Sequence, residues 1–141
     1  MRDDPAILAS DTAYRRVPEA FLDWDGNQER WVPTNAALRD PGGGREISVY
    51  LQSLLRVSEG PGDVASARPN SVAFSAGVGD ARALDFGVTH EPDQDTGPLR
   101  HAHGNINGNP TWGKGDYRDR RNALARRMLL AAGNVTLRPP A

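Results

Sequence analysis

Glycine and proline interrupt this chain so often that long regular elements have little room. With 15 Gly and 11 Pro among 141 residues, a large part of the chain must lie in turns and loops. The clearest element is the segment 116–133, DYRDRRNALARRMLLAAG, where Asp116 is placed to cap the start of a helix and Gly133 to end it. We therefore expect short elements joined by irregular connections, and one longer helix near the C-terminal end.

Within 116–133 the apolar residues recur at the spacing of one helix face. The expected buried stripe consists of Leu124, Ala125, Met128, Leu129 and Ala132. The arginines of the same segment fall largely outside this stripe, at positions 118, 120, 126 and 127. The segment therefore predicts an amphipathic helix that packs on one face of the remaining structure.

Shorter segments before this helix alternate apolar and polar residues, as half-buried strands do. Strands are expected at 14–17, 70–77, 85–90 and 99–106, a short helix at 78–84, and a further strand in the tail NVTLRPPA. Trp24 and Trp31 flank the turn signal Asp25-Gly26 and are expected to lie on a hairpin. The apolar residues of 46–55 include pairs at i and i+4, which favours a helix capped by Ser48 over a strand.

These elements predict an α+β fold, a small and mostly antiparallel sheet with the C-terminal amphipathic helix packed on one face. The repeated βαβ units of a doubly wound sheet are missing. The length suits one domain, and only 38% of the residues are hydrophobic, so the core is expected to be modest. We expect a flexible N-terminal tail at 1–12 and a single domain at 13–138.

Several classes of protein are excluded by the residues that the chain lacks. Without cysteine it has no disulfide, no thiolate nucleophile and no cysteine-bound zinc. The first residues, MRDDP, contain no apolar stretch typical of a signal peptide, and no run approaches 18 apolar residues. A cytoplasmic protein without a membrane partner is expected.

The charge is unevenly distributed along the chain. Residues 1–98 carry nine arginines against sixteen acidic residues, a net charge of −7, whereas residues 99–141 carry eight basic residues against two aspartates, a net charge of +6. A basic segment of this kind can face a polyanion such as nucleic acid. The simpler alternative, which we favour, is that the acidic part neutralises the basic part within one fold.

The three histidines are the first candidates for chemistry. If 99–106 is a strand, His101 and His103 point to the same side, and His90 ends the neighbouring strand. Three interpretations are open: a metal site completed by His90 or by Asp93 or Asp95, a metal-free acid–base or phosphate site, and a purely structural pair. The structural interpretation is favoured, and no metal site is assigned.

Cations near the histidines are candidates for binding a phosphate or another anion. The glycine-rich loop 104–115 leads into the N-terminal end of the expected helix, where Lys114 and Arg118 lie and where free backbone N–H groups attract anions. Asp116 and Asp119 oppose this, since they occupy the position that an anion would take. Arg15 and Arg16 form a second candidate pair. A nucleic-acid site would lack an extended aromatic platform.

Five segments together resemble a family of small uncharacterised bacterial proteins. They are RRVP (15–18), PTNAALRD (33–40), ISVYL (47–51), ARALDFGVTHEP (81–92) and HAHGNINGN (101–109), and they span most of residues 15–130. The chain departs from the family pattern at Leu38, where phenylalanine is expected, and at Asp85, where glycine is expected. The resemblance implies a one-domain bacterial protein with the His-Ala step on a core element, and it implies no catalytic role.

Two functions are consistent with these observations. The first is an interaction or accessory protein that acts through a protein partner or as a homo-oligomer, since no complete catalytic set is recognised. The alternative is a small enzyme or a nucleotide- or phosphate-binding domain, related to toxins or defence, that uses His101 and His103 with nearby arginines. Whether the chain is an enzyme, and which cofactor it would use, stay open at this level.

Overall fold

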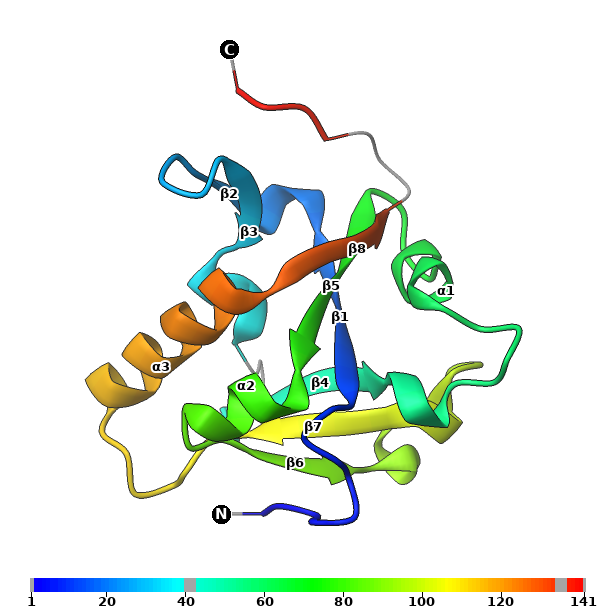
Figure 1. Ribbon diagram of the computed structural model, residues 1–141. Helices are drawn as coiled ribbons and strands as arrows, with labels where there is room; N and C mark the ends of the chain where they lie inside the picture. The colour runs from blue at the N-terminus through cyan, green and yellow to red at the C-terminus, as the bar shows by residue number, and fades with distance from the viewer. Residues whose placement is uncertain (1, 40–42, 134–136, 141) are drawn as a thin grey trace.

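The computed structural model describes residues 2–39, 43–133 and 137–140, and it is a single α+β domain. Six strands form one antiparallel sheet in the order β6-β7-β4-β1-β5-β8, and two strands form a separate hairpin (Figure 1). The strands of the sheet are β1 (Thr12–Pro18), β4 (Glu46–Leu51), β5 (Ser71–Gly77), β6 (Gly87–His90), β7 (His103–Asn107) and β8 (Leu129–Gly133). The hairpin consists of β2 (Leu22–Asp25) and β3 (Arg30–Pro33).

Three α-helices accompany the strands: α1 (Pro61–Ser66), α2 (Val78–Ala83) and α3 (Lys114–Arg127). Short 3-10 helices occupy several of the connections, at Glu19–Phe21, Asn35–Leu38, Gln52–Leu54, Pro92–Gln94 and Arg100–Ala102. None of the described helices has the length and apolar composition that a bilayer crossing requires.

The sheet splits between its two central strands. β1 pairs with β5 along its whole length, from Thr12 opposite Gly77 to Pro18 opposite Ser71. With β4, in contrast, β1 pairs only at Ala13 opposite Leu51 and at Tyr14 opposite Tyr50. Beyond these pairs β1 rises with β5 while β4 continues across the molecule beside β7 (Figure 1). The divergence opens a gap in the hydrogen-bonded ladder in the middle of the sheet.

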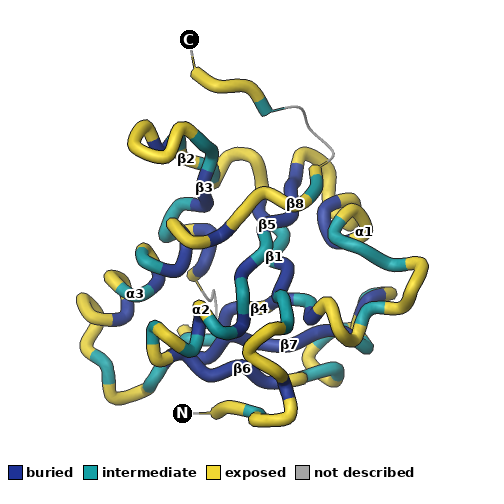
Figure 2. Tube along the Cα trace, viewed as in Figure 1, coloured by how far each residue is buried: buried dark blue, intermediate teal, exposed yellow. Residues whose placement is uncertain are grey.

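One face of the sheet carries the main core. Every second residue of the central strands points to this face, which gives a cluster of fully buried side chains that includes Val17, Ile47, Val49, Phe74 and Ile106. The helices α2 and α3 and the 3-10 helix Asn35–Leu38 cover it, as the buried interior in Figure 2 indicates. Burial of apolar area on this face is the main source of stability.

The opposite face is divided between an apolar part and a polar part. α1 covers the β1–β5 side, where Val64 and Ala65 pack against Tyr14 and Ala73 in a second, smaller cluster. The β4–β7 side instead presents a row of polar residues in register, with Ser48 opposite Asn105 and Tyr50 opposite His103. This polar part is where the side chains suited to chemistry gather.

The fold class and most of the expected elements are confirmed. The strands predicted at 14–17, 70–77 and 85–90 correspond to β1, β5 and β6, and the short helix at 78–84 corresponds to α2. The tryptophan hairpin is β2–β3, with Trp24 opposite Trp31 and their rings in edge-to-face contact at 5.5 Å. The C-terminal helix packs on one face of the domain, and its residues Leu124 and Ala125 are buried as expected.

The prediction that 46–55 contains a helix capped by Ser48 is wrong. Residues 46–51 form β4, a central strand, and only Gln52–Leu54 makes a helical turn. In this strand Ile47, Val49 and Leu51 face the main core, because alternation with period two, rather than the i, i+4 pairs, decides which side is buried. Pairing with β1 and β7 outweighs the local preference.

The strand predicted at 99–106 and the helix predicted at 116–133 are each shorter than expected. Arg100–Ala102 is a 3-10 turn, so β7 begins only at His103. α3 ends at Arg127, and the next residues form β8 because they pair with the edge of β5. The guanidinium of Arg30 donates to the carbonyl oxygens of Arg126 and Met128, which satisfies groups that the end of the helix leaves open.

Because α3 ends at Arg127, the buried stripe expected along 116–133 is only partly correct. Met128 is buried, but Leu129 lies on β8 and is 57% exposed, and Ala132 also lies outside the helix. The strand predicted in the C-terminal tail falls partly on residues 134–136 and 141, which lie outside the described residues, and 137–140 form no strand.

At the N-terminal end, residues 2–11 lie against the domain, where Ile7 is buried and the Asp4 amide donates to the Val88 carbonyl at 2.8 Å.

Candidate functional site

The candidate site is a cavity of about 670 Å³ on the polar face, where β1 and β4 diverge. Strand residues form its floor and two loops form its walls, one after α1 and one before β7. A second cavity of about 570 Å³ adjoins it and shares four of its residues. The shared residues are Arg16, Tyr50, Arg68 and Asp95.

Arg15 holds the divergent strands in place. Its side chain donates to the Ala37 carbonyl oxygen through Nε at 3.1 Å and through Nη2 at 2.8 Å, and to the Ser48 carbonyl oxygen through Nη1 at 2.9 Å. The guanidinium thus replaces part of the β1–β4 ladder that the divergence removes. Arg15 was predicted to bind an anion. It does line the cavity, but its guanidinium donates these hydrogen bonds to backbone carbonyl oxygens.

His103 and Ser48 form a hydrogen-bonded pair on neighbouring strands. The Nδ1 atom of His103 lies 2.8 Å from the Glu91 carbonyl oxygen, and Nε2 lies 3.3 Å from Ser48 Oγ. A carbonyl oxygen only accepts, so Nδ1 carries the proton, and Nε2 of the neutral ring is an acceptor for the Ser48 hydroxyl. His103 is 4% exposed and Ser48 is exposed, so the buried ring faces an accessible hydroxyl.

Tyr50 and Asp95 form a second polar pair beside the first. The Tyr50 hydroxyl donates to Asp95 Oδ2 at 2.7 Å, and the Tyr50 ring lies edge-on to His103 at 5.7 Å. Burial and the neighbouring Asp95 carboxylate raise the pKa of Tyr50 to about 12. Burial opposes ionisation of Asp95, but the Gly97 amide, the Tyr50 hydroxyl and His103 together lower its pKa. The pair is therefore a neutral phenol donating to a carboxylate.

Two arginines give the cavity a positive wall. Arg16 projects from β1 to the polar face, where its Nη1 donates to the Val64 carbonyl oxygen at 3.3 Å. Arg68 is exposed and follows α1. The described lining residues include one carboxylate, Asp95, and two guanidinium groups besides Arg15, so the cavity suits an anionic ligand.

The three histidines do not converge. Nε2 of His101 lies 2.6 Å from Glu59 Oε1, and the Arg56 amide and His101 together lower the pKa of Glu59. His90 is exposed, and its Nε2 hydrogen bonds to the His101 carbonyl oxygen at 2.8 Å. Because Arg100–Ala102 is a turn rather than a strand, His101 and His103 lie in different surroundings. Within the described residues no three His, Asp or Glu side chains are grouped to hold a metal.

The remaining predicted ligands lie elsewhere. Lys114 is the first residue of α3 and lines a different cavity, and Arg118 forms an ion pair with Asp119 at 3.7 Å on the surface of the helix. Of the predicted residues, the structure therefore brings Arg15, Arg16 and His103 together.

Sequence reasoning missed Ser48, Tyr50 and Arg68 as site residues, and it named Asp95 only as an alternative metal ligand. Ser48 was assigned as a helix cap because 46–55 was predicted as a helix. The signal that could have found it is the alternation Ile47, Ser48, Val49, Tyr50, which in a strand places the hydroxyl-bearing residues together on one face. Asp95 and Arg68 lie in loops that only the folded chain brings beside β4.

No protein-family model matches this chain, and neither the curated proteins nor the solved structures contain a match to it.

Proposed function

We propose that this protein is an enzyme that cleaves or transfers a phosphate ester, with Ser48 as the nucleophile and His103 as its general base. One observation carries the proposal: Ser48 Oγ, the His103 ring and the Glu91 carbonyl oxygen follow one another in hydrogen-bond contact, and Ser48 and His103 line a cavity that arginines also line. A hydroxyl becomes an effective nucleophile when a base lies beside it and a third group orients that base. The arginines favour a substrate with an anionic reacting group.

The reaction that this arrangement supports has two steps. In the first, Ser48 Oγ attacks phosphorus, its proton passes to Nε2 of His103, and the bond from phosphorus to the ester oxygen breaks. The imidazolium then gives its proton to the departing oxygen, which leaves as an alcohol. In the second step Nε2 deprotonates a water or an acceptor hydroxyl, whose oxygen attacks the phosphorus of the phosphoserine. The bond from phosphorus to Ser48 Oγ breaks, and the imidazolium returns the proton from Nε2 to Oγ, which restores Ser48 and neutral His103. The other proton stays on Nδ1, which donates to the Glu91 carbonyl oxygen throughout.

The other side chains of the cavity hold the substrate and the base in position. Arg16 and Arg68 are placed to neutralise the charge on the non-bridging phosphate oxygens. The Tyr50 ring packs edge-on to His103 and limits rotation of the imidazole, and its bond to Asp95 anchors the loop that walls the cavity.

The experiment is a hydrolysis assay on the purified protein with p-nitrophenyl phosphate and bis(p-nitrophenyl) phosphate. We expect release of p-nitrophenol, and a fall in kcat of about 10²–10⁴-fold in Ser48→Ala and in His103→Gln. Ser58→Ala and His90→Gln are the matched controls, because both residues are exposed and lie outside the cavity, and they should retain the wild-type rate.

Two outcomes contradict the proposal in different ways. Turnover that is lost in His103→Gln but retained in Ser48→Ala would show that Ser48 is not the nucleophile. If p-nitrophenol is released from p-nitrophenyl acetate but from neither phosphate ester, and the release depends on Ser48, the substrate is an acyl ester. Mass spectrometry of a quenched reaction should detect one phosphoryl group on the peptide that contains Ser48.

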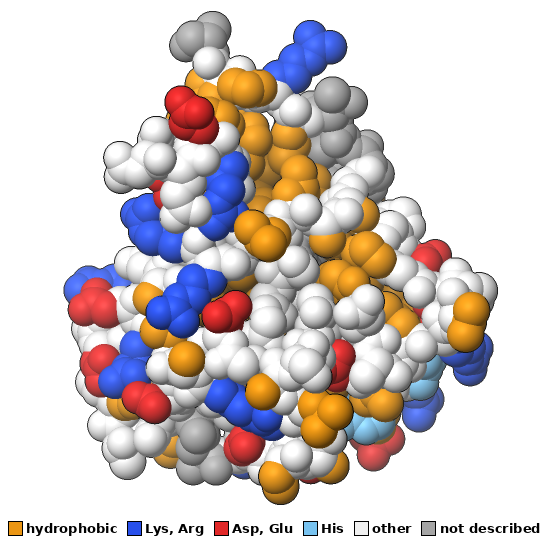
Figure 3. Space-filling view, in the orientation of Figure 1, with side chains coloured by type: hydrophobic (Ala, Val, Ile, Leu, Met, Phe, Trp, Pro, Cys, Tyr) orange, Lys and Arg blue, Asp and Glu red, His pale blue; other side chains and the backbone are white. Residues whose placement is uncertain are grey.

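Self-association through β8 is a second candidate function, and it is the specific form of the interaction role that the sequence favours. β8 is an edge strand with one partner, β5, among the described strands, and it carries no charge along LLAAG. Leu129 is 57% exposed and Leu130 is 48% exposed, and Figure 3 shows hydrophobic side chains gathered over this strand. An uncharged edge can pair antiparallel with the same strand of a second copy without repulsion.

Light scattering coupled to size exclusion tests this candidate across a range of protein concentrations. We expect a dimer that dissociates on dilution, and a monomer at all concentrations for Leu130→Lys. Leu8→Lys, which places the same charge on an exposed leucine far from β8 in the chain, is the control and should leave the dimer intact. A wild-type monomer at every concentration would reject the interface.

A further inference from the structure

A separate cavity of about 320 Å³ lies at the start of α3, beside the first residues of β4. It shares no lining residue with the Ser48 cavity. Four of its lining residues are cations, and among the described residues no carboxylate lines it. The lining residues are Arg39, Gly43, Arg45, Lys114, Tyr117 and Arg121.

Arg121 is the unusual member of this group. Its side chain is buried, with 7% of the residue exposed, and its Nε atom has no hydrogen-bond partner among the described residues. The guanidinium carbon lies 4.3 Å from the centre of the Tyr117 ring. Burial lowers the pKa of Arg121, Tyr117 opposes this in part, and the charges of Arg39, Arg45 and Arg118 lower the pKa further. A buried cation surrounded by cations is costly unless an anion neutralises it.

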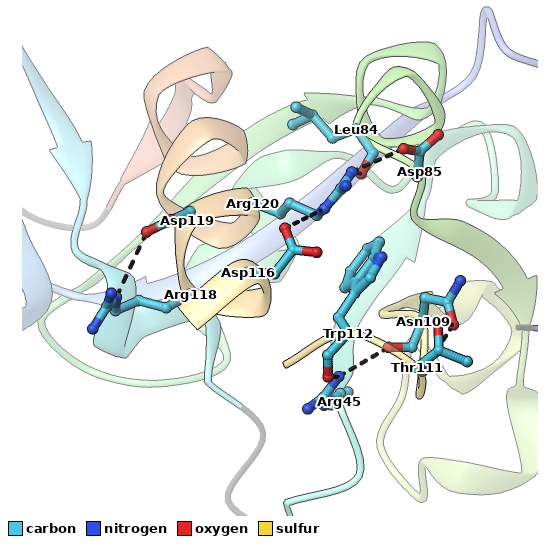
Figure 4. A network of polar contacts seen from close by, with 10 residues as sticks. All are labelled: Arg45, Leu84, Asp85, Asn109, Thr111, Trp112, Asp116, Arg118, Asp119 and Arg120. Atoms are coloured by element: carbon cyan, nitrogen blue, oxygen red, sulfur yellow. Dashed lines mark hydrogen bonds and ion pairs between the residues drawn. The ribbon is translucent and has the colours of Figure 1, made fainter. Parts of the chain in front are cut away.

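Arg45 is held in place beside it. Its Nη1 donates to the carbonyl oxygens of Asn109 at 2.9 Å and Trp112 at 2.7 Å, as Figure 4 shows. Its guanidinium carbon lies 5.0 Å from the centre of the same Tyr117 ring. Two guanidinium groups are thus fixed around one ring before any ligand arrives, which reduces the entropy cost of binding.

The other arginines of α3 each form an ion pair with an aspartate. Arg120 contacts Asp116 at 2.9 Å and Asp85 at 2.8 Å, and Arg118 contacts Asp119 at 3.7 Å (Figure 4). Near the other end of the helix the same is true of two more pairs, Arg126 with Asp25 and Arg127 with Asp80. Arg121 faces the cavity instead.

The start of α3 adds further attraction for an anion. α3 has 14 residues and begins at Lys114, so the free N–H groups of its first turn lie beside the cavity. The two aspartates that would compete with an anion at this end, Asp116 and Asp119, are engaged by Arg120 and Arg118. The competing acidic side chains therefore have partners of their own.

We propose that this cavity binds the phosphate group of a small molecule, with Arg39, Arg45, Lys114 and Arg121 as its ligands. The site is independent of the proposed catalysis at Ser48, since none of the described residues lines both cavities. The chemistry that it recognises is a compact, doubly charged oxyanion, either free phosphate or a phosphate ester.

A titration followed by amide nitrogen–proton NMR separates this site from the Ser48 cavity. Gly43, Gly113 and Gly115 report on the cavity at α3, whereas Gly97 reports on the cavity that adjoins Ser48. We expect saturable shifts of the first three amides with inorganic phosphate and with ribose 5-phosphate, and none with sodium chloride at equal ionic strength. Saturation by the sugar phosphate alone would identify an ester as the ligand, and saturation by both would identify the phosphate group itself.

Matched variants complete the test. The double variant Arg39→Ala/Lys114→Ala changes two exposed residues and should weaken phosphate binding by roughly tenfold or more, because two charge-assisted contacts are lost. Arg127→Ala removes an exposed cation near the other end of α3, outside the cavity, and should leave the affinity unchanged. Arg121→Met should abolish binding and at the same time raise Tm, because it removes a buried charge that has no acidic partner among the described residues.

Three results would overturn the proposal. They are the absence of saturable shifts at Gly43, Gly113 and Gly115, unchanged affinity in the double variant, and an equal loss in Arg127→Ala. A lower Tm for Arg121→Met would show that Arg121 already has a stabilising partner in the free protein. Each result is independent of ester hydrolysis, so failure here leaves the Ser48 proposal standing.

Discussion

Gly104 offers the sharpest test of the sheet that supports the site. It lies in β7 between β6 and β4, directly after His103. A Cβ atom added there would lie 2.5 Å from the Thr89 carbonyl oxygen and 3.1 Å from Leu51 Cδ1. Real Cβ atoms essentially never approach closer than 3.0 Å, so β6 and β7 would have to separate by about 0.5 Å at this point.

The magnitude for Gly104→Ala follows from these contacts. Replacing glycine by alanine in a strand gains about 0.5–1 kcal/mol, since the unfolded chain loses freedom. Overpacking against a fixed strand costs about 1–3 kcal/mol, and a strained ladder loses about 1 kcal/mol for each weakened hydrogen bond. We expect a net loss of about 2 kcal/mol in the free energy of unfolding, and a fall in Tm of about 6–8 °C.

Urea unfolding followed by circular dichroism measures this change, with Gly62→Ala as the matched control. Gly62 lies in α1, and an added Cβ would meet nothing within 4 Å, so this variant should be more stable than the wild type by about 0.5 kcal/mol. The m value should stay constant in both variants. A Gly104→Ala protein within about 0.5 kcal/mol of the wild type would refute the packing of β7 between β6 and β4.

Three further predictions concern single side chains. Asp25→Ala should lower the free energy of unfolding by about 2 kcal/mol in urea titration, because this 6% exposed carboxylate accepts two hairpin amides and the Arg126 guanidinium. Tyr50→Phe should remove the tyrosine that ionises near pH 12 in an absorbance titration. With the pKa of Tyr50 raised, its contribution to stability is complete below pH 10 and is lost as the pH rises through about 12. Arg15→Lys should lower both Tm and the rate of ester hydrolysis, because lysine cannot bridge two strands as Arg15 does, and Ser48 then shifts; an unchanged KM would identify Arg15 as a positioning residue.

The sequence predicts the fold class and several individual elements for local physical reasons. Alternation of apolar and polar residues identifies 70–77 as a strand, and a turn signal between two tryptophans identifies the hairpin, because both features depend on residues close in the chain. The helix at the C-terminal end is also local in origin, as its buried Leu124 and Ala125 indicate, although it begins at Lys114 after Gly113 and not after a cap at Asp116. For the same reason Arg16 and His103 could be selected as residues suited to chemistry before their surroundings were known.

Pairing between strands far apart in the chain decided the elements and contacts that the sequence did not predict. Residues 46–51 carry both a helical and a strand pattern, and only the edges of β1 and β7 select the strand. Likewise, Leu129 was expected in the helix, but it pairs with β5 and is an exposed residue of strand β8. The pairing of Ser48 with His103 depends on a register between segments 55 residues apart, and spacing along the sequence does not determine it.

By itself, then, the sequence determined which segments alternate, where the chain turns, and which chemistries lack their residues, because each of these depends on neighbours in the chain. The tertiary structure alone decided that His103 faces Ser48 rather than His101, and that Arg121 is buried among cations while its neighbours on α3 are paired. Strand register and burial are properties of the whole domain, since they depend on which distant surfaces exclude water together.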